Sequence, residues 1–138
     1  MFVPMSSPDI TPAEIEAVNA VLNTTTLSIG PQITAFEDAI ASYIGVRHGI
    51  GVNSGTSGLH LAVIAADIHD GDEVITSSFS FIASANSIVY ERAKPVFVDI
   101  DPLTGNIDPT QIEAAITPRT KAILPIHLFG QLCDIDAI

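Results

Sequence analysis

Two kinds of hydrophobic spacing follow each other along this chain. Over residues 1–46, apolar side chains recur every three or four positions, as in Ile15, Val18 and Leu22, and this spacing predicts amphipathic helices. Over residues 47–138, short apolar runs alternate with helical segments. Strands that alternate with helices are typical of βαβ units and a mostly parallel sheet. We therefore expect an α/β fold preceded by a helical segment.

Capping signals place several helix boundaries. Thr11-Pro12-Ala13-Glu14 predicts a capping box with proline at the first helical position, and Asp108-Pro109-Thr110-Gln111 repeats that pattern. A second helix is expected from Ile33 to Tyr43, ended by Gly45. The segment 56–67 is apolar on most sides, which predicts a buried helix. The other expected elements are strands at 48–52, 73–76, 95–100 and 121–126, a helix at 80–91 and a first helical turn at 134–138.

Composition and charge narrow the class of protein. Of the 138 residues, 47% are hydrophobic and only 15% charged, against a typical charged share of about 25%. This excess of hydrophobic over charged residues predicts that many side chains are buried, in the core or at an interface. The net charge is −11, with five basic residues in all. Nucleic-acid binding requires clustered Lys and Arg, so this class is excluded.

The cysteine count and the N-terminal residues predict the cellular compartment of the protein. Cys133 is the single cysteine, so no internal disulfide can form, and no basic residue lies near it in the sequence to favour a nucleophilic role. The first residues have no positively charged region followed by an apolar run, and no stretch approaches a membrane span. We expect a cytoplasmic protein without a membrane partner.

The segment Asn53–Leu61 carries the strongest chemical signal. It places small residues between an expected strand and an expected helix, where unpaired N–H groups and the helix dipole favour a phosphate. An ordinary helix cap is the simpler interpretation. A dinucleotide-binding turn is disfavoured because Gly49 and Gly51 fall inside the expected strand and Ser54 replaces the third glycine. A P-loop is excluded because no lysine follows Gly55.

Several short motifs follow one another over essentially the whole chain. They are Leu27-Ser28-Ile29-Gly30-Pro31, Asn53-Ser54-Gly55-Thr56-Ser57, Gly71-Asp72-Glu73-Val74-Ile75-Thr76, Phe79-Ser80-Phe81-Ile82-Ala83, Phe97-Val98-Asp99-Ile100-Asp101 and His127-Leu128-Phe129-Gly130-Gln131. In this order, they resemble the DegT/StrS family of pyridoxal phosphate (PLP)-dependent sugar aminotransferases. The resemblance implies the N-terminal portion of a fold-type I large domain. This is a three-layer αβα sandwich with a mostly parallel sheet, and its remainder lies beyond residue 138.

The resemblance also implies roles for individual residues. Thr56 and Ser57 would hold the PLP phosphate, with Gly55 leaving room for it, and Phe81 would stack on the pyridine ring, with Phe79 ranked second. The further candidates are Asn86, whose role is unassigned, and Gly30 and Pro31, which would lie near an active site built at the interface of a homodimer.

The lysine that carries the catalysis is expected past residue 138, so no catalytic residue is assigned here. Lys94 and Lys121 lie at expected strand starts outside any matching motif. His127 follows a strand and could face the cofactor or serve a structural hydrogen bond. His60 and His69 are interpreted as surface or packing residues. No metal site is expected, because turn and cap roles explain Asp99, Asp101 and Asp108.

The implied activity is transfer of an amino group, usually from glutamate, to a keto group of a nucleotide-linked sugar in the full-length protein. The 138-residue chain itself would be inactive. Three alternatives stay open: a PLP-dependent sugar dehydratase of the same family, a non-catalytic fragment or binding module, and an unrelated nucleotide-binding α/β domain.

Overall fold

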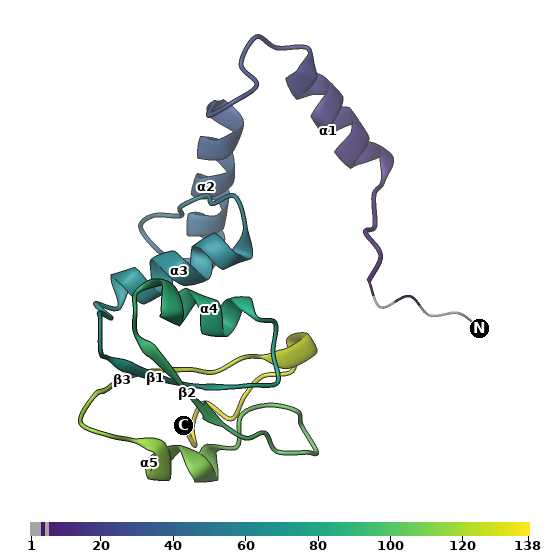
Figure 1. The fold of residues 1–138 in the computed structure, drawn as a ribbon. Coiled ribbons are helices and arrows are strands. Elements are labelled where there is room, and N and C mark those ends of the chain that lie inside the picture. Colours follow the sequence, from purple (N-terminus) through teal and green to yellow (C-terminus); the bar gives the residue numbers. More distant parts are fainter. Residues whose placement is uncertain (1–3, 5) are drawn as a thin grey trace. The chain divides into compact units, whose positions relative to one another are not determined.

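The computed structural model describes residue 4 and residues 6–138. The chain divides after Gly51 into two compact units, residues 1–51 and 52–138, which are described separately (Figure 1).

Two helices form the described part of the first unit, and both were expected, although α2 begins two residues earlier and ends one residue later than predicted. α1 spans Pro12–Leu22 and α2 spans Pro31–Ile44. The capping box is present: the backbone N–H of Thr11 donates to Glu14 Oε2 at 2.7 Å, and the Thr11 hydroxyl accepts from the N–H of Ala13 at 3.2 Å. α2 ends at Gly45, whose φ of 80° is a left-handed conformation that glycine adopts without strain.

The expected strand at residues 48–52 is wrong. This segment is irregular and pairs with no described strand. The N–H of Gly51 instead donates to Glu37 Oε1 at 2.7 Å. A Cβ on Gly49 would lie 2.6 Å from the carbonyl oxygen of Glu37, so the segment runs against α2 more closely than a side chain allows. Alternating apolar residues can form a strand only beside a neighbour that takes their backbone hydrogen bonds.

A parallel sheet forms the middle layer of the second unit. Its strands are β1 (Glu73–Ser77), β2 (Lys94–Val98) and β3 (Thr120–Leu124), in the order β2-β1-β3. β1 lies in the centre, with Ile75 opposite Val96 of β2 and Ile123 of β3. The mostly parallel sheet is thus confirmed.

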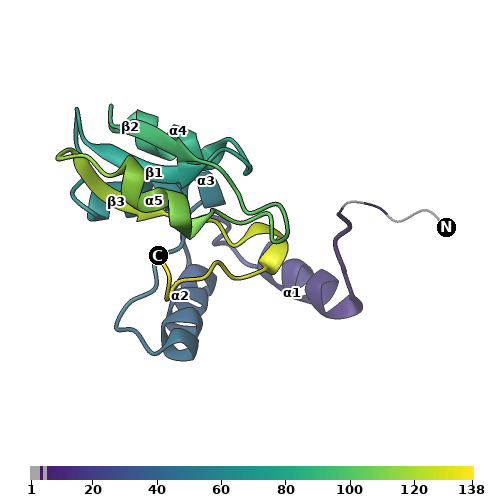
Figure 2. The same cartoon turned by 90° about the horizontal axis from the view of Figure 1, so that it is seen from below.

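Helices cover both faces of this sheet. α3 (Gly55–Ala65) and α4 (Ala83–Tyr90) pack on one face, and the 3₁₀ helix η1 (Pro109–Gln111) continues into α5 (Ile112–Ala115) on the other (Figures 1 and 2). Two cores result: Val74 packs with Val63 and Ile88 on the α3–α4 side, and Ile75 packs with Ile107 and Ile112 on the α5 side. This alternation confirms the three-layer αβα arrangement.

Three details differ from the sequence expectation. α4 begins at Ala83 and not at residue 80, so Phe81 precedes the helix. The Ile100 end of the third expected strand forms an isolated antiparallel bridge with Ile107. α3 is not buried on all sides. Only its residue Val63 is buried, whereas Leu61 and Ile64 remain 47% and 46% exposed, because α3 packs against the rest of its unit along one side. The chain ends in the expected single turn, closed by the Ile138 N–H on the carbonyl of Asp134.

Candidate functional site

The carboxyl ends of the three strands share one edge of the sheet, and the N-terminus of α3 is level with that edge. α3 joins the start of β1 through the short segment 66–72, so it runs antiparallel to the strands (Figure 1). An 11-residue helix and a five-residue strand both extend about 16 Å. Open α/β sheets bind ligands at this edge.

Hydrogen bonds at the start of α3 distinguish its two hydroxyl side chains. The Ser54 hydroxyl caps the helix by accepting from the N–H of Ser57 at 3.2 Å. The Ser57 hydroxyl donates to Asn53 Oδ1 at 2.6 Å and lies 3.1 Å from the Ser54 hydroxyl. The Thr56 hydroxyl has no hydrogen-bond partner within the described part of the chain. Ser57 therefore also holds the loop, whereas Thr56 is available to a ligand.

Backbone donors at the same place fit a phosphate. The N–H groups of Gly55 and Thr56 are the first two of α3, and no described residue accepts from them. A Cβ on Gly55 would meet nothing within 4 Å, so the space beside this residue is open. Free N–H groups at the positive end of a helix dipole are the chemistry that binds phosphate. The phosphate of PLP therefore fits the residues present.

The two candidate aromatic residues follow β1. Phe81 is 75% exposed, which leaves its ring free to cover a planar ligand. Phe79 is packed differently: its ring lies 3.7 Å from the position that a Cβ on Gly105 would take. The structure therefore leaves Phe81 as the more available of the two rings.

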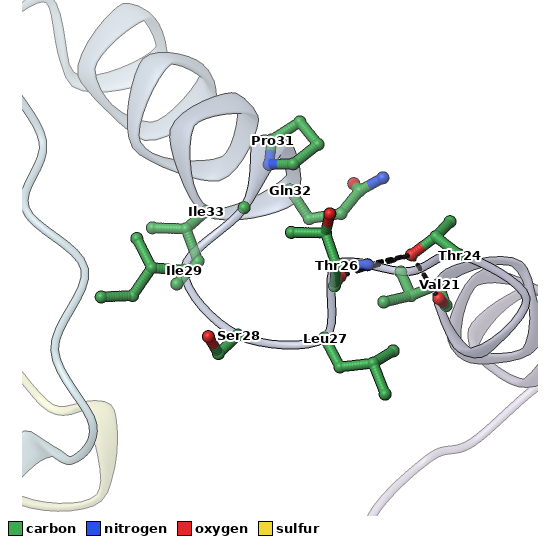
Figure 3. A pocket seen from close by; sticks show the side chains of 10 residues that line it. Val21, Thr24, Thr26, Leu27, Ser28, Ile29, Pro31, Gln32 and Ile33 are labelled. Carbon is green, nitrogen blue, oxygen red and sulfur yellow. Dashed lines mark hydrogen bonds between the residues drawn. The ribbon is translucent and has the colours of Figure 1, made fainter.

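The other candidates have less defined surroundings. Asn86 is half-buried in α4, and its side chain makes no hydrogen bond with the described residues. Gly30 and Pro31 cap and begin α2 in the first unit. They line a pocket of about 160 Å³ with residues of the preceding loop (Figure 3). A hydrogen bond from the N–H of Thr26 to the Thr24 hydroxyl, at 3.3 Å, shapes that loop.

His127 lies in the segment that follows β3 at the carboxyl edge. Its side chain is exposed, and its Nδ1 accepts a hydrogen bond from the N–H of Cys133 at 3.0 Å. The Cys133 thiol is buried and donates to the carbonyl of Ile126 at 3.1 Å. The structural hydrogen bond expected of His127 is thus present, and its Nε2 has no partner among the described residues.

Asn106 was not predicted from the sequence. Asn106 is 4% exposed. Its Nδ2 donates to the carbonyls of Gln131 and Leu132, both at 3.0 Å, and its Oδ1 accepts from the N–H of Leu128 at 3.1 Å. Because these partners are backbone groups 22 to 26 residues away, no local pattern could have identified them.

Glu73 was also missed, and it lies at the opposite, amino edge. Its side chain is 2% exposed and accepts from the Thr117 hydroxyl at 2.6 Å, from Arg119 at 2.7 Å and from Lys94 at 3.3 Å. The hydrogen bonds from Thr117 and Arg119 lower the pKa of Glu73 to about 2. This carboxylate ties β1 to β2 and to the turn before β3, and it accounts for Lys94 as a structural residue.

The remaining polar candidates have structural partners. His60 pairs with Glu91 at 2.6 Å and packs edge-on against Tyr90, which agrees with a packing role. The Asp108 carboxylate accepts from the side chain of Gln111 and from Thr110, and these bonds lower its pKa. No group of three or more His, Cys, Asp or Glu side chains suited to a metal ion occurs among the described residues. None of the helices in that part of the chain is long and apolar enough to cross a membrane.

Comparison with known proteins identifies one family. The sequence model of the DegT/DnrJ/EryC1/StrS aminotransferase family matches residues 8–138. The chain is 50% identical over 137 residues to the spore coat polysaccharide biosynthesis protein SpsC of Bacillus subtilis, covering 99% of this chain and 35% of that protein. It is also 50% identical to GDP-perosamine synthase of Caulobacter vibrioides, covering 99% and 37%. The chain thus spans about a third of the length of these relatives.

Solved structures show the same similarity. NtdA from Bacillus subtilis, with its bound cofactor PMP (pyridoxamine phosphate), is 39% identical and superposes with a TM-score of 0.86, covering 94% of this chain and 31% of that one.

Proposed function

This chain belongs to the DegT/DnrJ/EryC1/StrS aminotransferase family, and from that premise we propose that the full-length protein is a PLP-dependent sugar aminotransferase. It transfers an amino group from glutamate to a keto group of a nucleotide-linked sugar. Residues 1–138 form the N-terminal portion of its PLP-binding large domain, with 1–46 as a helical segment and 47–138 as the βαβ part. We further propose a cytoplasmic homodimer.

The start of α3 is the observation that carries this proposal. The N–H groups of Gly55 and Thr56 and the Thr56 hydroxyl are free donors at a helix N-terminus, on the edge of the sheet where α/β proteins bind ligands. These groups suit a dianionic phosphate. GDP-perosamine synthase is named for a nucleotide-linked sugar, and SpsC is named for polysaccharide biosynthesis. Both names support a nucleotide-linked sugar as the substrate.

In this mechanism, the candidate site residues of the chain bind and orient the cofactor. When bound, PLP supplies the electron sink that makes amino transfer possible. Gly55, Thr56 and Ser57 would bind the phosphate, and Phe81 would cover one face of the ring and exclude water from it. Lys94 and Lys121 lie at the amino ends of β2 and β3, away from this edge. The amine that moves the substrate proton is therefore expected beyond residue 138.

The test begins with the intact mass of the source protein and an absorbance scan of the same sample. We expect a mass well above 14.5 kDa and the absorbance of protein-bound PLP. Incubation with glutamate and a nucleotide-linked keto sugar should then form 2-oxoglutarate and an amino sugar in equal amounts. Loss of water from the sugar without amino transfer would indicate the dehydratase instead. A mass matching 138 residues without cofactor absorbance would contradict the proposal.

A further inference from the structure

The segment from His127 to Cys133 is held by an unusual set of hydrogen bonds. It follows β3, contains the 3₁₀ helix η2 (Leu128–Gly130) and carries an exposed histidine at its start. Phe129 within η2 has a φ of 52°, and Gly130 one of 85°, so this turn is left-handed. Such a segment keeps its shape only where surrounding contacts determine it.

Asn106 provides those contacts from a distant turn. Its carboxamide uses both N–H groups and its oxygen, in three hydrogen bonds to backbone atoms of Leu128, Gln131 and Leu132. Asn106 thus binds both ends of η2 and the residue next to Cys133. Because Asn106 is 4% exposed, water cannot readily replace these bonds when the side chain is changed.

The position of Cys133 in turn determines the tautomer of the His127 imidazole. Its N–H donates to His127 Nδ1 at 3.0 Å. An imidazole nitrogen that accepts a hydrogen bond carries no hydrogen itself, so in the neutral ring the hydrogen must be on Nε2. No described residue accepts from that nitrogen. The ring therefore presents a free N–H at the carboxyl edge of the sheet, the edge to which Thr56 and Phe81 also belong.

We propose that Asn106 is a positioning residue that holds the 127–133 segment so that His127 is a neutral Nε2–H donor to an oxygen acceptor of the bound cofactor. The geometry of Asn106 and His127 stands independently of the activity, whereas the acceptor rests on the proposed function. His127 is the residue that contacts the ligand in this proposal, and Asn106 acts through it.

The first experiment reads the hydrogen on the ring directly. In the full-length protein labelled with ¹⁵N-histidine, long-range ¹H–¹⁵N spectra should show His127 with an unprotonated Nδ1 and a protonated Nε2. The spectrum of His127→Asn identifies the resonances. A hydrogen on Nδ1 in the wild-type protein would overturn the proposal, whatever the enzyme's activity.

The second experiment removes the support. Asn106→Asp keeps the size of the side chain but replaces the NH₂ group, which donates to the carbonyls of Gln131 and Leu132, by a carboxylate oxygen that can only accept. We expect amide hydrogen exchange at Leu128 and Cys133 to accelerate about tenfold or more, together with mixed His127 tautomers. Asn19→Asp, the same change on exposed α1, serves as the control and should alter neither. Unchanged exchange and an unchanged tautomer in Asn106→Asp would refute the role of Asn106.

A matched pair of substitutions at His127 tests the two nitrogen positions of the ring without changing Asn106. The amide oxygen of His127→Asn can still accept from Cys133 but offers no donor at the Nε2 position, whereas His127→Gln offers a donor there but not the acceptor. His127→Asn should retain slow exchange at Cys133 and weaken PLP binding severalfold, and His127→Gln should do the reverse. Equal PLP binding in His127→Asn and the wild type would exclude the cofactor as the acceptor. If amino transfer fails but the tautomer is as stated, only the proposed function is contradicted.

Discussion

The two hydroxyl groups at the start of α3 allow ligand binding to be separated from folding. The Thr56 hydroxyl has no partner in the described part of the chain, whereas the Ser57 hydroxyl donates to Asn53 and lies within hydrogen-bond distance of Ser54. Thr56→Val keeps the shape of the side chain and removes only a donor that a phosphate would use. Ser57→Ala removes such a donor and also a contact that holds the loop.

The expected magnitudes follow from these contacts. A hydrogen bond to a charged group contributes about 1.5–3 kcal/mol, so Thr56→Val should weaken PLP binding by about ten- to a hundredfold. Its unfolding free energy should stay within about 0.5 kcal/mol of the wild type. Ser57→Ala should weaken PLP binding similarly and also lower the unfolding free energy by about 1 kcal/mol, the usual net contribution of a neutral hydrogen bond.

The assay is a binding titration of both variants in the full-length protein with PLP and with pyridoxal, which lacks the phosphate. Urea unfolding without ligand gives the stability of each variant. Thr56→Val should leave pyridoxal binding unchanged. Equal loss of affinity for PLP and pyridoxal would refute the assignment of Thr56 to the phosphate. A clear loss of stability in Thr56→Val would show that its hydroxyl has a structural partner.

Three further changes test the fold. The Glu73 pKa is lowered from 4.5 to about 2, so its stabilising contribution is present above pH 4.5 and is lost as the pH falls toward 2. Glu73→Gln should therefore flatten the pH dependence of the unfolding free energy in that window, and an unchanged acid limb would contradict this. Ile75→Ala, at a fully buried position, should lower the unfolding free energy by about 2–5 kcal/mol, as measured by urea unfolding, whereas a loss below that range would mean that the core closes over the site. Gly105→Ala, at φ 73°, should cost about 1–2 kcal/mol in the same assay, and Gly105→Asn less, because asparagine tolerates this conformation; equal stability of Gly105→Ala and the wild type would refute the strain.

The elements that could be predicted from the sequence are those whose signals are local. The capping box at Thr11 and the left-handed Gly45 depend on neighbouring residues, and both boundaries were predicted. The strand at 48–52 could not be judged locally, because a strand exists only beside another strand. The start of α4 was predicted three residues too early, at residue 80; the Ser80 hydroxyl lies 2.9 Å from the hydroxyl of Ser84 and caps no backbone N–H.

The residues of the candidate site also fall into those with a local sequence signal and those without one. Gly55, Thr56 and Ser57 were predicted because small residues before an apolar helix are a local phosphate-binding signal, and the family resemblance assigned them to the PLP phosphate. Asn106 and Glu73 depend on partners 21 to 46 residues away in the sequence. Neither residue type nor spacing shows such partners before the fold brings the strands together.

Polar groups are arranged differently at the amino and carboxyl edges of the sheet. Those at the amino edge stabilise the fold, whereas those at the carboxyl edge are available to bind a ligand. At the amino edge, the buried Glu73 carboxylate has three donors, one on β2 and two in the turn before β3, because an unpaired charge there would be costly. At the carboxyl edge, the Thr56 hydroxyl and His127 Nε2 have no partner within the described residues. An unpaired donor costs little where water reaches it, and it is then free to bind a ligand. Asn106 supports such a donor from a buried position with all its own hydrogen bonds formed, so the carboxyl edge can present unpaired groups without losing its shape.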